Sequence, residues 1–157
     1  MLIIISDLHL GDGTTADSIS PSAFRLFDRR LTETARFASI RKDGKYSPIQ
    51  EMDILLLGDV LDPLHSTLWL DTHPEDSNYI RPWSDPTNPN YAAKLMQVTR
   101  AILDHNEEAM QVLRRLASGE EIRLAPATSD GKPDFQSSEQ IPIKVLSTTI
   151  RNGHGDN

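Results

Sequence analysis

The sequence predicts an α/β fold, in which helices cover a parallel β-sheet. Two apolar runs, at residues 2–5 and 54–57, have the length and composition of buried strands, and each stops abruptly at acidic or imidazole side chains. A helical pattern lies between them. Because a strand, a helix and a second strand of this spacing form a unit whose strands pair in parallel, we expect both strands in one sheet.

The helix between these strands is predicted from apolar side chains spaced three and four residues apart. They are Phe24, Phe27, Leu31, Ala35 and Ala38. This spacing is typical of an amphipathic helix that packs on a sheet. Ser20 and Pro21 suit its start, as N-cap residue and first-turn proline, and the turn at Lys42-Asp43-Gly44-Lys45 follows its end.

The segment at about residues 63–90 is rich in proline and carries both tryptophans of the chain. Prolines at this density exclude a long helix or strand. A loop of this length in a compact domain is usually functional or disordered. Trp69 and Trp83 could contact a substrate, but anchoring of a surface loop to the core explains them at least as well.

A longer helix is predicted over residues 91–118, with one apolar stripe and with Gly119 as the residue that closes it. The stripe consists of Leu95, Val98, Ile102, Ala109, Leu113 and Leu116. We expect His105 to be a surface or hydrogen-bonded histidine rather than a metal ligand, because no second ligand follows at helical spacing. The remaining segments are a short strand, a flexible loop and a final strand, at residues 122–124, 125–140 and 143–150.

The composition is that of a single domain on the polar side of the globular range. The 157 residues are 38% hydrophobic, with a mean hydropathy of −0.42. This length can bury one core, but we expect part of one sheet face to stay exposed. No cysteine is present, which excludes disulfides and thiolate metal sites and is compatible with a reducing cytoplasm.

The apolar runs are too short for a signal peptide or a membrane span, so we expect a soluble, cytoplasmic protein without a membrane partner. The net charge of −7 and the pI near 5.1 disfavour broad electrostatic contact with nucleic acid. They leave open a nuclease whose metal ions contact the phosphates.

Polar side chains that could bind metal follow both predicted strands. Asp7 and His9 are separated by one residue, so on an extended backbone they would lean to the same side. Asp59 follows Gly58, where the missing side chain permits a tight turn. If the two strands are adjacent and parallel, the three side chains converge. Such a mixed oxygen and nitrogen set suits Mn, Fe or Zn better than Ca or Mg.

At these residues the chain resembles the calcineurin-like metallophosphoesterase superfamily. Asp7-Leu8-His9 matches its D-x-H motif, and Gly58-Asp59-Val60-Leu61-Asp62 matches its G-D-x-x-D motif. The resemblance implies a two-sheet αββα sandwich with two divalent metal ions. It also implies that Asp7 and His9 bind one ion, that Asp59 bridges to the second, and that the reaction is phosphoester hydrolysis. Asp62 is expected to orient a ligand rather than to bind metal itself.

The chain departs from the family pattern in two places. The arginine that often follows G-D-x-x-D is replaced by Pro63, and His65 lies close enough in the sequence to substitute for it. No G-N-H-[DE] motif is present. The nearest match is the terminal run Arg151-Asn152-Gly153-His154-Gly155-Asp156-Asn157, which we interpret as a degraded third motif. It offers His154 as a proton donor to the leaving group and Asn152 as a weaker candidate metal ligand.

The family's later histidine ligands have no counterpart, so residues 1–157 are interpreted as one partial domain, with a missing C-terminal half as a possible partner. The proline-rich insertion resembles one found in some bacterial members, which would cover the metal site. The predicted function is hydrolysis of a phosphoester of unknown type. The main alternative is an inactive or partner-dependent fragment that binds metal or phosphate. A phosphotransferase with Asp7 as nucleophile is disfavoured, because His9 occupies the place of its second aspartate.

Overall fold

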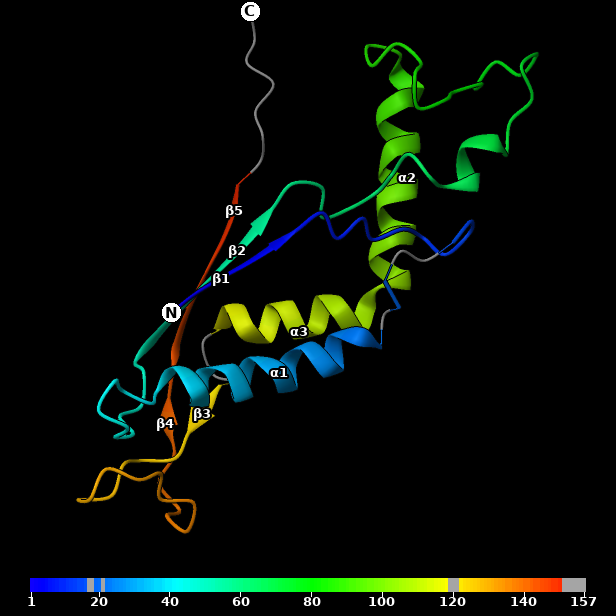
Figure 1. Cartoon of the computed structure of the whole chain (residues 1–157). Helices are drawn as coiled ribbons and strands as arrows, with labels where there is room; N and C mark the ends of the chain where they lie inside the picture. The colour runs from blue at the N-terminus through cyan, green and yellow to red at the C-terminus, as the bar shows by residue number, and fades with distance from the viewer. Residues whose placement is uncertain (17–18, 21, 119–121, 151–157) are drawn as a thin grey trace, which may run out of the picture.

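The computed structural model of the protein describes residues 1–16, 19–20, 22–118 and 122–150, with residues 147–150 placed by their backbone. Strand β2 (Glu51–Leu57) pairs in parallel with β1 (Leu2–Ser6) on one side and with β5 (Lys144–Ile150) on the other. Figure 1 shows the three running side by side. The predicted α/β class and the parallel pairing of the first two strands are thus confirmed.

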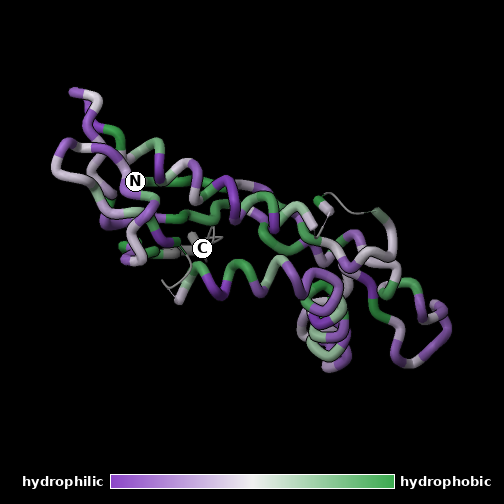
Figure 2. Tube along the Cα trace, turned by 90° about the horizontal axis from the view of Figure 1, so that it is seen from below, coloured by the Kyte–Doolittle hydropathy of each residue, from purple (hydrophilic) through white to green (hydrophobic). Residues whose placement is uncertain are grey.

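Helices α1 (Ala23–Ala38) and α3 (Glu107–Ser118) lie next to each other against the sheet (Figure 1). Their apolar faces and one face of the sheet form a common core, and apolar segments gather between helices and strands in Figure 2. The buried members from these elements are Phe24, Leu31, Ala35, Met52, Ile54, Ala109, Val112, Leu116 and Val145. The amphipathic pattern of the first helix therefore packs as expected.

The start of α1 differs from the prediction. Ser22 rather than Ser20 occupies the N-cap position, and its side chain makes no capping hydrogen bond. Ser20 contributes its carbonyl instead, which accepts a hydrogen bond of 2.8 Å from the amide of Ala23. Pro21 lies outside the described residues.

The single long helix predicted over residues 91–118 is wrong, because the chain bends at Asn106. Helix α2 (Pro89–His105) ends there, and α3 begins at Glu107 in a different direction (Figure 1). The Asn106 side chain is buried, and its Nδ2 donates to the carbonyls of Ile102 at 2.8 Å and Gly11 at 2.7 Å. An asparagine that hydrogen-bonds backbone in this way competes with helix continuation. Gly119, the predicted closing residue, lies outside the described residues.

The sheet face opposite the helices is partly exposed, as the composition suggested. Leu2, Ile4 and Leu146 retain 59%, 56% and 44% of their accessible surface. Leu2 and Leu146 flank Asp53 in one row across the strands, so these apolar side chains share a face. The short strand β3 (Arg123–Leu124) pairs antiparallel with β4 (Ile141–Pro142) beyond this sheet.

The proline-rich segment is a series of turns around one short 3₁₀ helix, η1 (Thr67–Leu70). Trp69 is buried, and its Nε1 donates to the carbonyl of Pro63 at 2.6 Å. The anchoring interpretation therefore holds for Trp69. It is wrong for Trp83, which is 79% exposed. Among the helices described, none is both long and apolar enough to cross a bilayer.

Candidate metal centre at the carboxyl edge of the sheet

The two motif loops run side by side beyond the carboxyl ends of β1 and β2. The amide of Asp7 donates to the carbonyl of Leu57 at 3.0 Å, and that of His9 donates to the carbonyl of Asp59 at 2.9 Å. The amide of Asp62 returns a hydrogen bond of 2.9 Å to the carbonyl of Leu10. The parallel pairing thus continues past the strands, which fixes the backbones of both motifs relative to each other.

The backbone of the first motif is not extended, which corrects the reasoning from sequence. Asp7 and His9 have φ angles of 53° and 45°, in the left-handed region. Aspartate and histidine adopt this region more often than most residues do. A positive φ is nevertheless uncommon even for them, because the conformation is strained. The strand ends at Ser6, so the side chains of Asp7 and His9 are placed by their left-handed backbone rather than by strand alternation. Strain of this kind is concentrated at functional sites.

Gly58 provides the space that the Asp7 carboxylate occupies. A Cβ atom built on Gly58 would overlap Oδ1 of Asp7 and would lie 3.2 Å from its Cγ. Gly58 also has a φ of 76°, which side chains other than glycine rarely adopt. Glycine is therefore favoured here for two separate reasons, and the first of them places the carboxylate of the first motif against the backbone of the second.

Asp62 lies between two imidazoles. Its Oδ2 is 2.6 Å from Nδ1 of His65 and 3.6 Å from Nδ1 of His9. Burial raises the pKa of Asp62, but contacts with His65 and the backbone amide of Leu64 outweigh it and hold the pKa below its usual value. A carboxylate near Nδ1 of a histidine is common around metal-bound histidines, in which the other ring nitrogen binds the ion.

Within the part of the chain that the structure describes, no three histidine or acidic side chains form a group that could hold one ion. Asp59 lies at the same edge as Asp7 and His9 and is exposed. Asp7, His9 and Asp59 fit a transition metal in donor type, although their side chains are not gathered around one point. The metal ions stay a prediction.

The third strand of the sheet ends at the same edge, since Leu57 pairs with Ile150. The terminal run that we interpret as a degraded third motif follows directly in the sequence. His154 and Asn152 belong to it and lie outside the described residues. Their predicted roles therefore stay predictions.

One residue of this region was missed in the sequence. Asp12 is buried, with Oδ1 accepting from the amide and the hydroxyl of Thr14 at 3.0 and 2.6 Å, and with Oδ2 accepting from the hydroxyl of Ser66. Burial raises the pKa of Asp12, but these hydrogen bonds outweigh it and lower the pKa below its usual value. The available signal was the Asp-x-Thr spacing, which is typical of an Asx turn.

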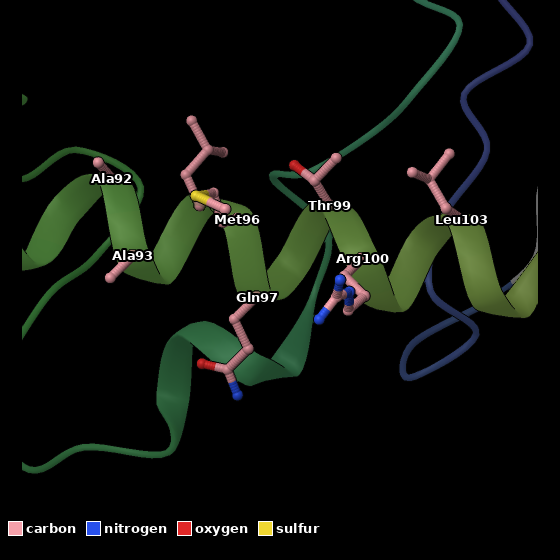
Figure 3. A pocket seen from close by; sticks show the side chains of 8 residues that line it. Ala92, Ala93, Met96, Gln97, Thr99, Arg100 and Leu103 are labelled. Atoms are coloured by element: carbon pink, nitrogen blue, oxygen red, sulfur yellow. The ribbon is translucent and has the colours of Figure 1, made fainter.

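A separate apolar groove runs along the outer side of α2. Met96, Thr99 and Leu103 point to one side of this helix, with Gln97 and Arg100 on the other (Figure 3). The groove is lined by α2 residues between Ala92 and Leu103, and none of the candidate metal ligands is among them. It contributes nothing to the candidate metal centre.

Comparison with known proteins identifies no relative: no protein-family model, no curated protein and no solved structure matches this chain.

Proposed function

We propose that the chain is the N-terminal part of a calcineurin-like metallophosphoesterase and that its function is metal-dependent hydrolysis of phosphoesters at the carboxyl edge of the sheet. The observation that carries the proposal is the pairing of the D-x-H and G-D-x-x-D loops. Their hydrogen-bonded backbones bring Asp7, His9 and Asp59 to one edge. An incomplete αββα sandwich is the architecture we propose for the fold.

In this proposal Asp7 and His9 hold one divalent ion, and Asp59 is shared with a second. Asp62 lies 3.6 Å from Nδ1 of His9, and in this proposal it orients the ring so that the other ring nitrogen binds the ion. Bound Mn, Fe or Zn would polarise the phosphoryl group and lower the pKa of a water molecule. His154 is proposed to protonate the leaving oxygen and Asn152 to add a ligand. The substrate is a phosphoester whose type the site does not select.

A second candidate function is binding of metal or phosphate without turnover, or turnover only with a partner. The exposed face formed by Leu2, Ile4 and Leu146 favours it, because apolar sheet surface of this kind is normally covered in a complete domain. The absence of a G-N-H-[DE] motif from the sequence favours it as well. The partner would then supply both the missing ligands and the cover.

Metal binding is tested by titration calorimetry with Mn²⁺ and Zn²⁺. We expect the wild type to bind, and Asp59→Asn to bind at least about tenfold more weakly, since even residues that only orient ligands change affinity by this amount. Asp104→Asn, an exposed aspartate on α2, is the matched control and should bind as the wild type does. No binding by the wild type, or equal binding by Asp59→Asn, would refute the proposal.

Turnover distinguishes the two candidates. With saturating Mn²⁺, p-nitrophenyl phosphate and bis-p-nitrophenyl phosphate should be hydrolysed faster by the wild type than by Asp59→Asn. Equal rates in two proteins that differ in metal affinity would favour the binding function. The ratio between the monoester and the diester would give the first information on substrate class.

A further inference from the structure

The loops that follow β1 and β2 are joined by side chains as well as by backbone. We name this group, Asp12, Thr14 and Ser66, the Asp12 clamp. Asp12 and Ser66 are both buried, although residues 13–16 beside the first and residues 64–65 beside the second are exposed. The sequence separates them by 54 positions, so their contact fixes one loop on the other.

Each hydroxyl of the clamp has a double function. Ser66 donates to Asp12 through Oγ and accepts on the same atom from the amide of Leu68 at 3.1 Å. Thr14 donates to Asp12 at 2.6 Å, and its Oγ1 accepts from the amide of Thr67 at 2.9 Å. Because each hydroxyl donates its hydrogen to the carboxylate, its oxygen is oriented to accept from the backbone of the second loop. The hydrogen bonds from the two hydroxyls to the Asp12 carboxylate are charge-assisted, a class that is stronger than bonds between neutral groups.

The clamp holds the far end of the turn that contains Asp62 and His65. The near end is held by the amide of Asp62, which donates to the carbonyl of Leu10. The hydroxyl of Thr15 adds a contact of 2.8 Å to the carbonyl of His65. With both ends fixed, the carboxylate of Asp62 is kept beside His9, even though Nδ1 of His9 lies 3.6 Å away, beyond hydrogen-bond distance.

We propose that Asp12 is a positioning residue of the candidate metal centre, which acts through Ser66 and Thr14 to hold Asp62 beside His9. The predicted effect of Asp12 on metal affinity rests on the proposed function. Its predicted effect on the loop does not, because the hydrogen bonds of the clamp involve only residues of the chain. The two parts can therefore be measured separately.

The first test uses the metal-free protein. In Asp12→Ala and Ser66→Ala we expect amide hydrogen exchange at residues 64–68 to accelerate at least about tenfold, while β1 and β2 keep their protection. The imidazole NMR signals of His9 and His65 should shift. Ser66→Thr keeps the hydroxyl and should restore both. Unchanged exchange and unchanged signals in both alanine variants would overturn the inference.

Asp85→Ala is the matched control. Asp85 makes the same local turn as Asp12, accepting from the amide and hydroxyl of Thr87 at 2.8 and 2.7 Å, but on an exposed loop. Its loss should alter neither the exchange at residues 64–68 nor the histidine signals. If Asp85→Ala has the same effect as Asp12→Ala, the clamp is only a general stability element and the inference fails.

The second test is Mn²⁺ affinity by calorimetry. We expect it to fall about tenfold in Asp12→Ala and Ser66→Ala and to recover in Ser66→Thr. Full affinity in both alanine variants, despite faster loop exchange, would overturn the link between the clamp and the metal. If the wild type itself binds no Mn²⁺, the proposed function fails, whereas the exchange and NMR results still decide whether Asp12 positions Asp62.

Discussion

Gly58→Ala tests the contact on which the two motifs depend most directly. The substitution adds one methyl group where the backbone has a φ of 76° and where the carboxylate of Asp7 already occupies the space. Gly44 offers an almost ideal comparison. It has a φ of 79°, but a Cβ added there would meet nothing within 4 Å. The same change at the two positions therefore separates backbone strain from displacement of Asp7.

The strain should be similar at both glycines. A left-handed backbone costs an alanine about 1–2 kcal/mol, and the entropy that alanine removes from the unfolded chain is the same in either variant. For a domain of this size, each 1 kcal/mol lowers Tm by about 2–4 °C. The overlap at Gly58 involves the far end of an exposed side chain, which can rotate into solvent. We therefore expect both variants to lose about 2–8 °C, with little difference between them.

The difference should appear in metal affinity. Once rotated away from Gly58, the Asp7 carboxylate must be returned to its position before it can bind an ion. Calorimetry with Mn²⁺ should therefore show weaker binding by Gly58→Ala, by about tenfold or more, and unchanged binding by Gly44→Ala. Thermal unfolding of both variants without metal provides the stability comparison.

Two results would refute this reasoning. If Gly44→Ala is as stable as the wild type, the assumed cost of the left-handed backbone is wrong for this chain. If Gly58→Ala binds Mn²⁺ as well as Gly44→Ala does, the space at Gly58 does not determine where Asp7 lies.

Further predictions concern the bend, the acidic loops and the tryptophans. Asn106→Ala should cost about 1–3 kcal/mol in urea unfolding, because it removes the side-chain donor to the carbonyl of Gly11 and one of the two donors to the carbonyl of Ile102; a cost below about 0.5 kcal/mol would contradict this. Asp12 and Asp62 have lowered pKa values in the folded state. The stability that their carboxylates contribute is therefore complete when the pH is above their usual pKa of 3.8, and it is lost as the pH falls below that value. The Tm gap between wild type and Asp12→Asn should therefore close in acid; a constant gap would argue against it. Acrylamide should quench the fluorescence of Trp69→Phe strongly and that of Trp83→Phe weakly, since Trp69 is buried and Trp83 exposed.

The sheet could be predicted from sequence because its strands are continuous apolar runs. The run at residues 54–57 marks a buried strand by composition alone, and the helix before it implies parallel pairing. The strand nevertheless begins earlier, at Glu51, because Glu51 pairs with Lys144 across the sheet. A partner that is 93 residues away extends the strand, and no local pattern contains that information.

The bend at Asn106 was missed because the apolar stripe continues through it. The signal against a single helix was local: an asparagine followed by Glu107 and Glu108 is typical of a helix N-terminus. What outweighs the helical pattern is a tertiary contact, the hydrogen bond from Asn106 to the carbonyl of Gly11. A buried polar group of this kind depends on a neighbour that the sequence does not identify.

For the candidate site, the motifs predicted that Asp7, His9 and Asp59 lie at one edge of the sheet. They did not predict the backbone conformation of these residues. The left-handed backbone at Asp7 and His9 lies just past the end of β1, so strand alternation was the wrong model. Asp12 was passed over because an aspartate between two glycines has the character of an exposed loop residue. Its burial depends on Ser66, which lies beyond the second motif.

The central position of β2 has a consequence for how the chain folds as it is synthesised. Its pairing with β1 spans 51 residues and its pairing with β5 spans 93. The longer loop costs only about 0.5 kcal/mol more to close, so the equilibrium penalty is small. The delay during synthesis is considerable, because at about 5–20 residues per second β5 emerges several seconds after β2. During that interval one edge of the apolar strand β2 has no partner, and such edges pair readily with other chains. Aggregation during expression should therefore depend on translation rate and temperature more than the stability of the finished fold would suggest.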